Sequence, residues 1–344
     1  MGKSKIGWTE HTVNPLRAMD VETAREGHWC EKISPGCANC YASGMQMPVF
    51  KMHEFVKSNR SKVQLFLSDA VLENVVRRKK PTVYFWCSMT DMFLLDYRDE
   101  WLDKCFAAMY EASQHTHIVL TKRPEVAATY FANNARRTKI ATAAWKAHVA
   151  RHPEKKPTFM QGDVVKHICA NWPLPNVVLG VSVENNEYRH RIDTLAGIPA
   201  AYRLVSAEPL LGELDLSDYL SIRPNGEGGW TKCYQPRCID WVIDGGESNS
   251  AKGFPHKERL AQVPWFRLLR DQCFAAGVPY FHKQNGEWVC PESSLVTPDN
   301  NRHHATWAGG TQYFRVGKKL AGNVLDGVIH EDFPDWTHGI SEDD

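Results

Sequence analysis

The sequence predicts an α/β fold in which parallel strands, joined by helices, form a complete or partial (β/α) barrel. Short runs rich in β-branched and aromatic residues alternate with longer stretches of helical spacing, which is the pattern of βα units. The strand-like runs are almost continuously apolar, as expected for parallel strands buried on both faces. A chain of 344 residues is also long enough for one such barrel.

Six clear strand candidates follow one another along the chain, and a shorter one precedes them. The shorter run lies near residues 12–16, and helical spacing is clearest at 99–113 and 262–276. The six clear runs are 83–88, 117–122, 177–183, 203–208, 241–246 and 279–284.

Composition and charge narrow the class of protein and its compartment. We interpret residues 1–330 as one barrel domain, 130–170 as a basic helical insertion within it, and 331–344 as an acidic tail. The apolar fraction of 43% excludes general disorder, and the formal charge of +1 leaves nucleic-acid binding to a local basic patch. No apolar run is long enough to cross a membrane, and the N-terminus lacks the apolar core of a secretory signal. We therefore expect a cytoplasmic protein without a membrane partner.

Polar or charged side chains follow each of the six clear strand candidates. The carboxyl ends of parallel strands converge on one face of a barrel, and the active sites of barrel enzymes lie there. A strand that ends in a solvated loop also needs polar residues, so a single such end indicates little. Their succession favours a functional face built from Ser88, Asp91, Lys122, Arg123, Ser182, Glu184, Glu208, Glu247, Lys283 and Gln284.

Three of the ten cysteines, Cys30, Cys37 and Cys40, fall within eleven residues. A Pro-Gly pair between them supplies a turn that brings the chain back toward a common point. In a reducing compartment such a cluster favours metal binding or redox chemistry over a disulfide with one free thiol. Zinc would need a fourth ligand, for which His28 and Cys87 are candidates. Three cysteines also suit a 4Fe–4S cluster that leaves one iron open to an external ligand.

An open iron is the basis of radical S-adenosylmethionine (SAM) chemistry. The amino and carboxylate groups of SAM chelate that iron, and one electron cleaves the sulfonium to a 5′-deoxyadenosyl radical. The usual cysteine spacing in these enzymes is C-x3-C-x2-C. Here the second interval is kept and the first is widened to six residues between Cys30 and Cys37. An aromatic residue, Tyr41, follows the last cysteine, as is typical of these enzymes.

Sequence blocks that run through nearly the whole chain extend this likeness. In them the chain resembles a phage-encoded family of radical-SAM-like proteins that share the SPGCxNCYA motif. It departs from that family in a longer stretch before Cys30 and in VIDGGE, where VGGE is common. The blocks are KSKIGWTEHTVNP at 3–15, SPGCANCYA at 34–42, CSMTDMF at 87–93, LTKRPE at 120–125, WPLPNVVLGVSVEN at 172–185, SAEPLLG at 206–212, WVIDGGES at 241–248, RDQCFAAGVPYFHKQNGEW at 270–288 and RVGKKLAGNVLDG at 315–327.

The resemblance implies a fold, an activity and two cofactors. The fold is a radical-SAM-like partial TIM barrel with loop and helix insertions, and the activity is that of a radical SAM enzyme. Cys30, Cys37 and Cys40 would hold a 4Fe–4S cluster with SAM beside it. An electron donor such as flavodoxin or ferredoxin would reduce the cluster. A phage protein of this kind acts in the cytoplasm of the host cell.

The resemblance also implies roles for the residues that contact SAM. Ser88 and Asp91 stand where a polar motif after the second strand receives the methionine amino group. Lys122 or Arg123 pairs with the methionine carboxylate, because a guanidinium grips a carboxylate at two points.

Two further positions complete the implied cofactor site. Glu184, with Ser182 beside it, stands where a carboxylate after the fourth strand approaches the ribose hydroxyls. Tyr41 packs beside the cluster or the adenine, or else it is a core residue at the start of a helix.

The later strand ends supply the substrate-facing, catalytic set, which is Glu208, Glu247, Lys283 and Gln284. A ring of salt bridges at the barrel mouth is the simpler alternative for these residues. We expect a small molecule, a nucleotide or DNA as substrate, and the rearrangement or modification of a nucleobase, as by an isomerase in thymine hypermodification. Aromatic residues of the late loops are candidates for stacking a base. They are Trp230, Tyr234, Trp288, Trp307, Tyr313 and Phe314.

A competing hypothesis makes the chain a zinc-binding, nucleic-acid-binding protein without radical chemistry. It uses the basic segment 131–166 as a surface for phosphates, although such charge runs are often only solvated helix faces. The basic residues of this segment are Arg136, Arg137, Lys139, Lys146, Arg151, Lys155, Lys156 and Lys166.

Overall fold

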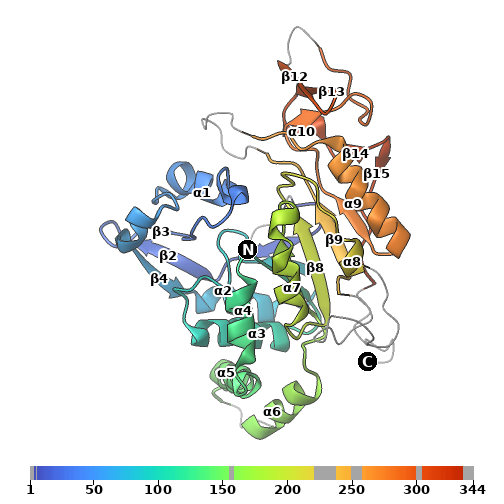
Figure 1. The fold of residues 1–344 in the computed structure, drawn as a ribbon. Helices are drawn as coiled ribbons and strands as arrows, with labels where there is room; N and C mark the ends of the chain where they lie inside the picture. The colour runs from blue at the N-terminus through green and yellow to red at the C-terminus, as the bar shows by residue number, and fades with distance from the viewer. Residues whose placement is uncertain are drawn as a thin grey trace.

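A seven-stranded parallel sheet, curved into a half-barrel, organises the molecule (Figure 1). The computed structural model describes residue 4 and residues 6–154, 159–220, 238–248, 258–299 and 304–335. The strand order is β1-β5-β6-β7-β8-β9-β10, and every neighbouring pair is parallel. The prediction of a partial barrel of parallel strands, including the short first strand, is therefore confirmed. The strands are β1 (His11–Val13), β5 (Val83–Trp86), β6 (Thr116–Thr121), β7 (Val177–Ser182), β8 (Tyr202–Ala207), β9 (Trp241–Asp244) and β10 (Tyr280–His282).

Helices cover the outer face of the sheet and share the large hydrophobic core with it. α3 (Asp99–Glu111) begins with two acidic residues, which suit the positive end of a helix dipole, and buries Leu102 and Phe106. α9 (Val263–Ala276) ends at Gly277, which has φ +60° and can adopt this left-handed conformation without a Cβ clash. Both helices lie where helical spacing predicts them. The other helices are α1 (Tyr41–Met45), α2 (Asp69–Arg77), α4 (Pro124–Ala132), α5 (Arg136–Arg151), α6 (Gln161–Ala170), α7 (His190–Ala196), α8 (Ser217–Leu220) and α10 (Lys318–Ala321).

The inner face of the half-barrel is apolar along most of the strands and becomes polar at their carboxyl ends. Side chains alternate between the two faces along a strand, so every second residue points inward. On β8, for example, Leu204 belongs to the inner hydrophobic cluster with Trp8 and Trp241, and Ser206 and Glu208 follow it toward the carboxyl edge. The same alternation leads from buried apolar residues to polar ones on β6, β7 and β10. It places the predicted strand-end residues around one opening.

Short antiparallel sheets and single-turn helices surround the half-barrel and lie outside the sequence prediction. Each strand in them has two to five residues, too few for a periodic pattern to be visible in the sequence. The strands are β2 (Leu16–Asp20), β3 (Glu26–Gly27), β4 (Val63–Leu67), β11 (Trp288–Val289), β12 (His304–Ala308), β13 (Thr311–Arg315), β14 (Val324–Leu325) and β15 (Val328–Ile329). The single-turn helices are η1 (Pro35–Cys37), η2 (Gln46–Phe50), η3 (Lys57–Lys62) and η4 (Asn186–Tyr188).

Candidate functional site

A cavity of about 360 Å³ opens at the carboxyl edge of the parallel sheet. Its apolar part is lined by Ile6, Trp8, Phe85 and Leu120. Of the residues predicted for the site, Glu184 alone does not line it. Those that do are Cys30, Cys37, Cys40, Tyr41, Ser88, Asp91, Lys122, Arg123, Ser182, Glu208, Glu247, Lys283 and Gln284.

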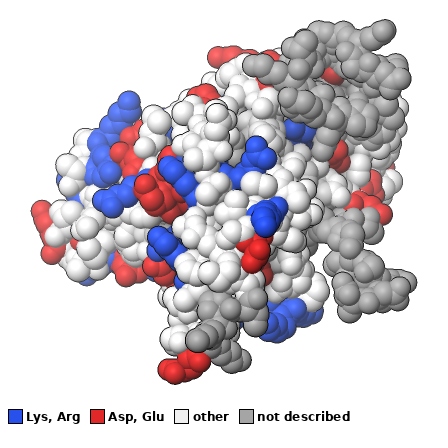
Figure 2. Space-filling view, turned by 90° about the horizontal axis from the view of Figure 1, so that it is seen from below, with Lys and Arg blue, Asp and Glu red and all other residues white. Residues whose placement is uncertain are grey.

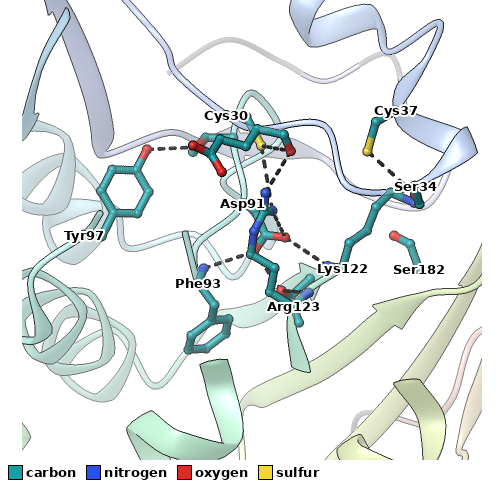
Figure 3. A network of polar contacts seen from close by, with 12 residues as sticks. Cys30, Ser34, Cys37, Asp91, Phe93, Tyr97, Lys122, Arg123 and Ser182 are labelled. Carbon is teal, nitrogen blue, oxygen red and sulfur yellow. Dashed lines mark hydrogen bonds and ion pairs between the residues drawn. The ribbon is translucent and has the colours of Figure 1, made fainter. Parts of the chain in front are cut away.

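The three cysteines lie on one segment, residues 30–40, which we call the cysteine loop. Each sulfur has a polar group beside it. The Arg123 guanidinium lies 4.0 Å from Sγ of Cys30, and the Ser34 hydroxyl lies 3.7 Å from Sγ of Cys37 (Figure 3). Cys40 precedes α1 and accepts hydrogen bonds from backbone N–H groups at the start of that helix. The loop therefore presents three thiols to the cavity, each with a polar group beside it.

Burial opposes the charged thiolate form of these cysteines when no metal is bound. Desolvation raises the pKa of Cys30 to about 12, and it also raises the pKa of Cys40. Both thiols are therefore protonated near neutral pH in the metal-free protein. A metal that binds them displaces these protons, so its affinity rises with pH.

An ion pair between Asp91 and Arg123 holds the start of the cysteine loop (Figure 3). Arg123 lies 3.0 Å from Asp91 and donates a second hydrogen bond, of 2.7 Å, to the carbonyl of Glu31. Both oxygens of Asp91 accept from the protein, including the hydroxyl of Thr121 and the backbone N–H of Lys122. The pair, which we call the inner clasp, is almost completely buried. Asp91 and Arg123 are thus occupied in positioning Cys30.

Glu184 lies beneath the cysteine loop instead of in the cavity. Its carboxylate is fully buried, pairs with Lys122 and Arg191, and accepts a hydrogen bond from Ser34. A Cβ on Gly36 would lie 2.4 Å from this carboxylate, so only glycine lets the loop pass so close. Burial pushes the pKa of Glu184 upward, but Lys122 and Arg191 outweigh it, so the pKa lies below its ordinary value. The position expected to approach a ribose thus anchors the loop, and it uses Lys122 to do so.

A second clasp holds the far end of the cysteine loop. Glu247 follows β9, pairs with Arg259, and accepts a hydrogen bond of 2.8 Å from Asn39. Arg259 also donates to the carbonyl of Pro35. We call this pair the outer clasp, because the Arg259 side chain is 36% exposed. Sequence reasoning placed Glu247 among the substrate-facing residues and missed Arg259, which no strand end or motif marks.

The far wall of the cavity lies at the ends of β8 and β10. Glu208 and Lys283 pair there at 2.7 Å, which matches the salt-bridge alternative for these two residues. Gln284 is 7% exposed and donates to the carbonyl of Gly246. Lys318, at the start of α10, also lines this side of the cavity and was not predicted.

Tyr41 and Ser88 form the part of the cavity between the cysteines and the far wall. The Tyr41 hydroxyl donates to the carbonyl of Ser88, and the Ser88 side chain is hydrogen-bonded to Asn14. Burial raises the pKa of Tyr41 well above its ordinary value, so its hydroxyl stays protonated and donates. These contacts connect α1 with the segment after β5, and that segment with the one after β1. Ser182, at the end of β7, also lines the cavity.

The two metals that the sequence left open place different demands on the three cysteines. Across the described parts of the chain, no three His, Cys, Asp or Glu side chains gather where one ion could bind. A tetrahedral zinc site needs its ligands around one ion. In a 4Fe–4S cluster each cysteine binds a different iron, so the three sulfurs stand apart. The three thiols line one wall of the cavity, and both metals stay hypotheses at this point.

The basic insertion is helical, but part of its charge is used inside the protein. Arg136 of α5 is buried, pairs with Asp99 and Asp103, and lies 3.8 Å above the ring of Tyr130. Arg151 pairs with Glu73 and Glu111. The prediction that these two arginines face phosphates is therefore wrong, and Lys155 and Lys156 lie outside the described residues. Figure 2 views the molecule from below relative to Figure 1, and on this face Lys and Arg are dispersed among acidic and uncharged residues.

The late-loop aromatic residues are not part of the cavity wall where the structure describes them. Tyr313 and Phe314 are buried in hydrophobic clusters, which is the core alternative to stacking a base. Trp288 packs on the core and donates to the carbonyl of Glu258, whereas Trp307 is 69% exposed. Trp230 and Tyr234 lie outside the described residues.

Comparison with known proteins places the chain in a family. The family described as "Protein of unknown function (DUF5131)" matches residues 3–334. The chain belongs to this family. No curated protein and no solved structure shows significant similarity to it. In the described part of this DUF5131 member, every helix is too short or too polar to cross a membrane.

Proposed function

We propose that this protein is a radical SAM enzyme whose 4Fe–4S cluster is held by Cys30, Cys37 and Cys40. One observation carries the proposal: the three thiols line one cavity at the carboxyl edge of a parallel half-barrel, each beside a polar group. Enzymes with parallel barrels bind their substrates at that edge. The cluster and SAM, when bound, supply one-electron cleavage of SAM and abstraction of hydrogen from carbon.

The residues of the chain prepare the cysteine loop for this role. The inner clasp positions Cys30, Glu184 holds Ser34 beside Cys37, and the outer clasp holds Asn39 beside Cys40. A site whose ligands are already in place loses less conformational entropy when it binds its metal. The apolar floor made by Trp8 and Phe85 limits water in the cavity and protects reactive species.

The proposed substrate is a nucleobase, free or in DNA, that is isomerised or otherwise modified. The apolar floor of the cavity offers the aromatic rings of Trp8 and Phe85, which supports a planar ring as the occupant. The proposal includes a flavodoxin or ferredoxin as electron donor and action in the cytoplasm of a phage-infected host.

Anaerobic reconstitution of the full chain with iron, sulfide and, in parallel, zinc tests the cofactor. We expect a brown protein with about four irons per chain. Tight binding of one zinc per chain without iron uptake would refute the proposal and favour the zinc alternative.

A further inference from the structure

Among the described residues, Lys318 is the basic side chain of the cavity wall that has no ion-pair partner. The other basic groups of the wall have a carboxylate within ion-pair distance. The ammonium group of Lys318 has no hydrogen bond or ion pair with any residue that the structure describes. The Glu31 carboxylate, next to Cys30 on the cysteine loop, likewise has no ion-pair partner in the described part of the chain. The pairs are Asp91–Arg123, Glu184–Lys122, Glu208–Lys283 and Glu247–Arg259.

The carboxylates near Lys318 in the described part of the chain are already paired with other cations. Partial desolvation lowers the pKa of Lys318, and the nearby ammonium group of Lys283 lowers it further. Glu208 and Glu287 act in the opposite direction, but Glu208 already pairs with Lys283, and Arg315 lies 3.6 Å from Glu287. An anion bound at the cavity rim would relieve the repulsion between the two lysines.

An unsatisfied acceptor lies on the same wall. The amide nitrogen of Gln284 donates to the carbonyl of Gly246 and to the hydroxyl of Ser248. Its Oε1 atom is buried and has no hydrogen-bond partner among the described residues. A buried acceptor without a donor costs free energy, and a bound molecule that brings a donor removes that cost. Among the described residues, this side of the cavity therefore leaves one ammonium group without an anion and one amide oxygen without a donor.

We propose that Lys318, with Lys283 beside it, forms a subsite for an anionic group of the substrate, either a phosphate or a carboxylate. The inference rests on the proposed function in one respect: it assigns the cysteine side of the cavity to the cluster and SAM, and the far wall to the substrate. The subsite itself follows from the charged groups on the far wall. Its test measures binding and does not require catalytic activity.

Calorimetric titration of the full chain, as purified and after anaerobic reconstitution, tests this subsite. The probes are thymidine, thymidine 5′-monophosphate, 5-carboxy-2′-deoxyuridine and SAM. Lys318→Gln is compared with Lys319→Gln, which makes the same charge change on the neighbouring exposed residue outside the cavity wall. We expect Lys318→Gln to weaken a charged nucleoside about tenfold and thymidine less than about twofold, because a charge-assisted contact is lost. Lys319→Gln should leave all affinities unchanged.

The outcomes separate the sources of the anion and separate this inference from the proposed function. A loss confined to the monophosphate assigns a phosphate, and a loss confined to the carboxylated nucleoside assigns a carboxylate. A loss confined to SAM overturns the inference, because the lysine then serves the cofactor. The inference is also overturned if the wild-type protein does not prefer either charged probe to thymidine, or if both variants behave alike. Iron uptake is measured independently, so failure of the cluster is recognised separately.

Discussion

The two walls of the cavity use their charges differently. Around the cysteine loop, Asp91, Glu184 and Glu247 each pair with a cation, and each pair is hydrogen-bonded to the loop. On the far wall, Lys318 has no such partner among the described residues. A charged pair that is hydrogen-bonded to the loop fixes donor atoms in place, whereas an unneutralised charge such as that of Lys318 is suited to recognise a ligand. The comparison separates residues that hold the loop from residues that contact a substrate.

The largest effect is expected from removing one thiol of the cysteine loop. Cys37→Ala should reduce the iron bound after anaerobic reconstitution from about four per chain to almost none, because two cysteines do not retain such a cluster. Cys169→Ala, at an exposed cysteine on α6, is the control and should bind iron like the wild type. Iron and sulfide assays measure both. Equal iron contents in Cys37→Ala and the wild type would show that the cysteine loop does not hold the metal.

A smaller effect is expected from the two clasps, and it should differ between them. Arg123→Met leaves Asp91 charged and buried, so the free energy of unfolding should fall by about 3–5 kcal/mol. Arg259→Met should cost only about 1–2 kcal/mol, because Arg259 is 36% exposed and water reaches Glu247 once it is gone. Urea unfolding at pH 7 measures both losses. Equal losses would contradict the distinction between an inner and an outer clasp.

The smallest effect concerns Glu184, beneath the cysteine loop, and the way in which its contribution to stability depends on pH. The pKa of Glu184 is lowered below the usual 4.5, so its charged form stabilises the fold above that pH. This contribution is lost as the pH falls through the pKa of the folded state. Glu184→Gln should therefore unfold more easily than the wild type at pH 7, and the gap should narrow below pH 4.5. Urea unfolding at several pH values measures it, and a constant gap would refute the assignment.

The fold of the half-barrel could be predicted because its strands carry a strong local signal. Runs such as 177–183 are apolar throughout, and buried parallel strands require that pattern. The short sheets around the half-barrel could not be predicted, because β3 and β11 have two residues each and depend on contacts distant in the sequence. Strand ends also indicated the side chains that surround the opening, with the exception of Glu184.

The division of labour among those side chains could not be predicted from the sequence. Glu184 and Ser182 are two residues apart, yet Ser182 lines the cavity and Glu184 lies beneath the loop, because Gly36 leaves room for its carboxylate. Whether a carboxylate faces a ligand or a protein cation depends on partners such as Arg259 and Arg191, and neither is near its partner in a recognisable motif. Lys318 has no strand-end signal either, because it begins a helix of four residues.

The central claim is that the cysteine loop supports radical SAM activity. Production of 5′-deoxyadenosine tests this claim most directly. The full chain is reconstituted anaerobically, reduced with dithionite and incubated with SAM, and the product is quantified by liquid chromatography with mass spectrometry. We expect 5′-deoxyadenosine from the wild type and from Cys169→Ala, none from Cys37→Ala, and a higher yield when thymidine 5′-monophosphate or phage DNA is added. A wild-type protein that holds its full complement of iron, yet produces no more 5′-deoxyadenosine than Cys37→Ala, would contradict the account.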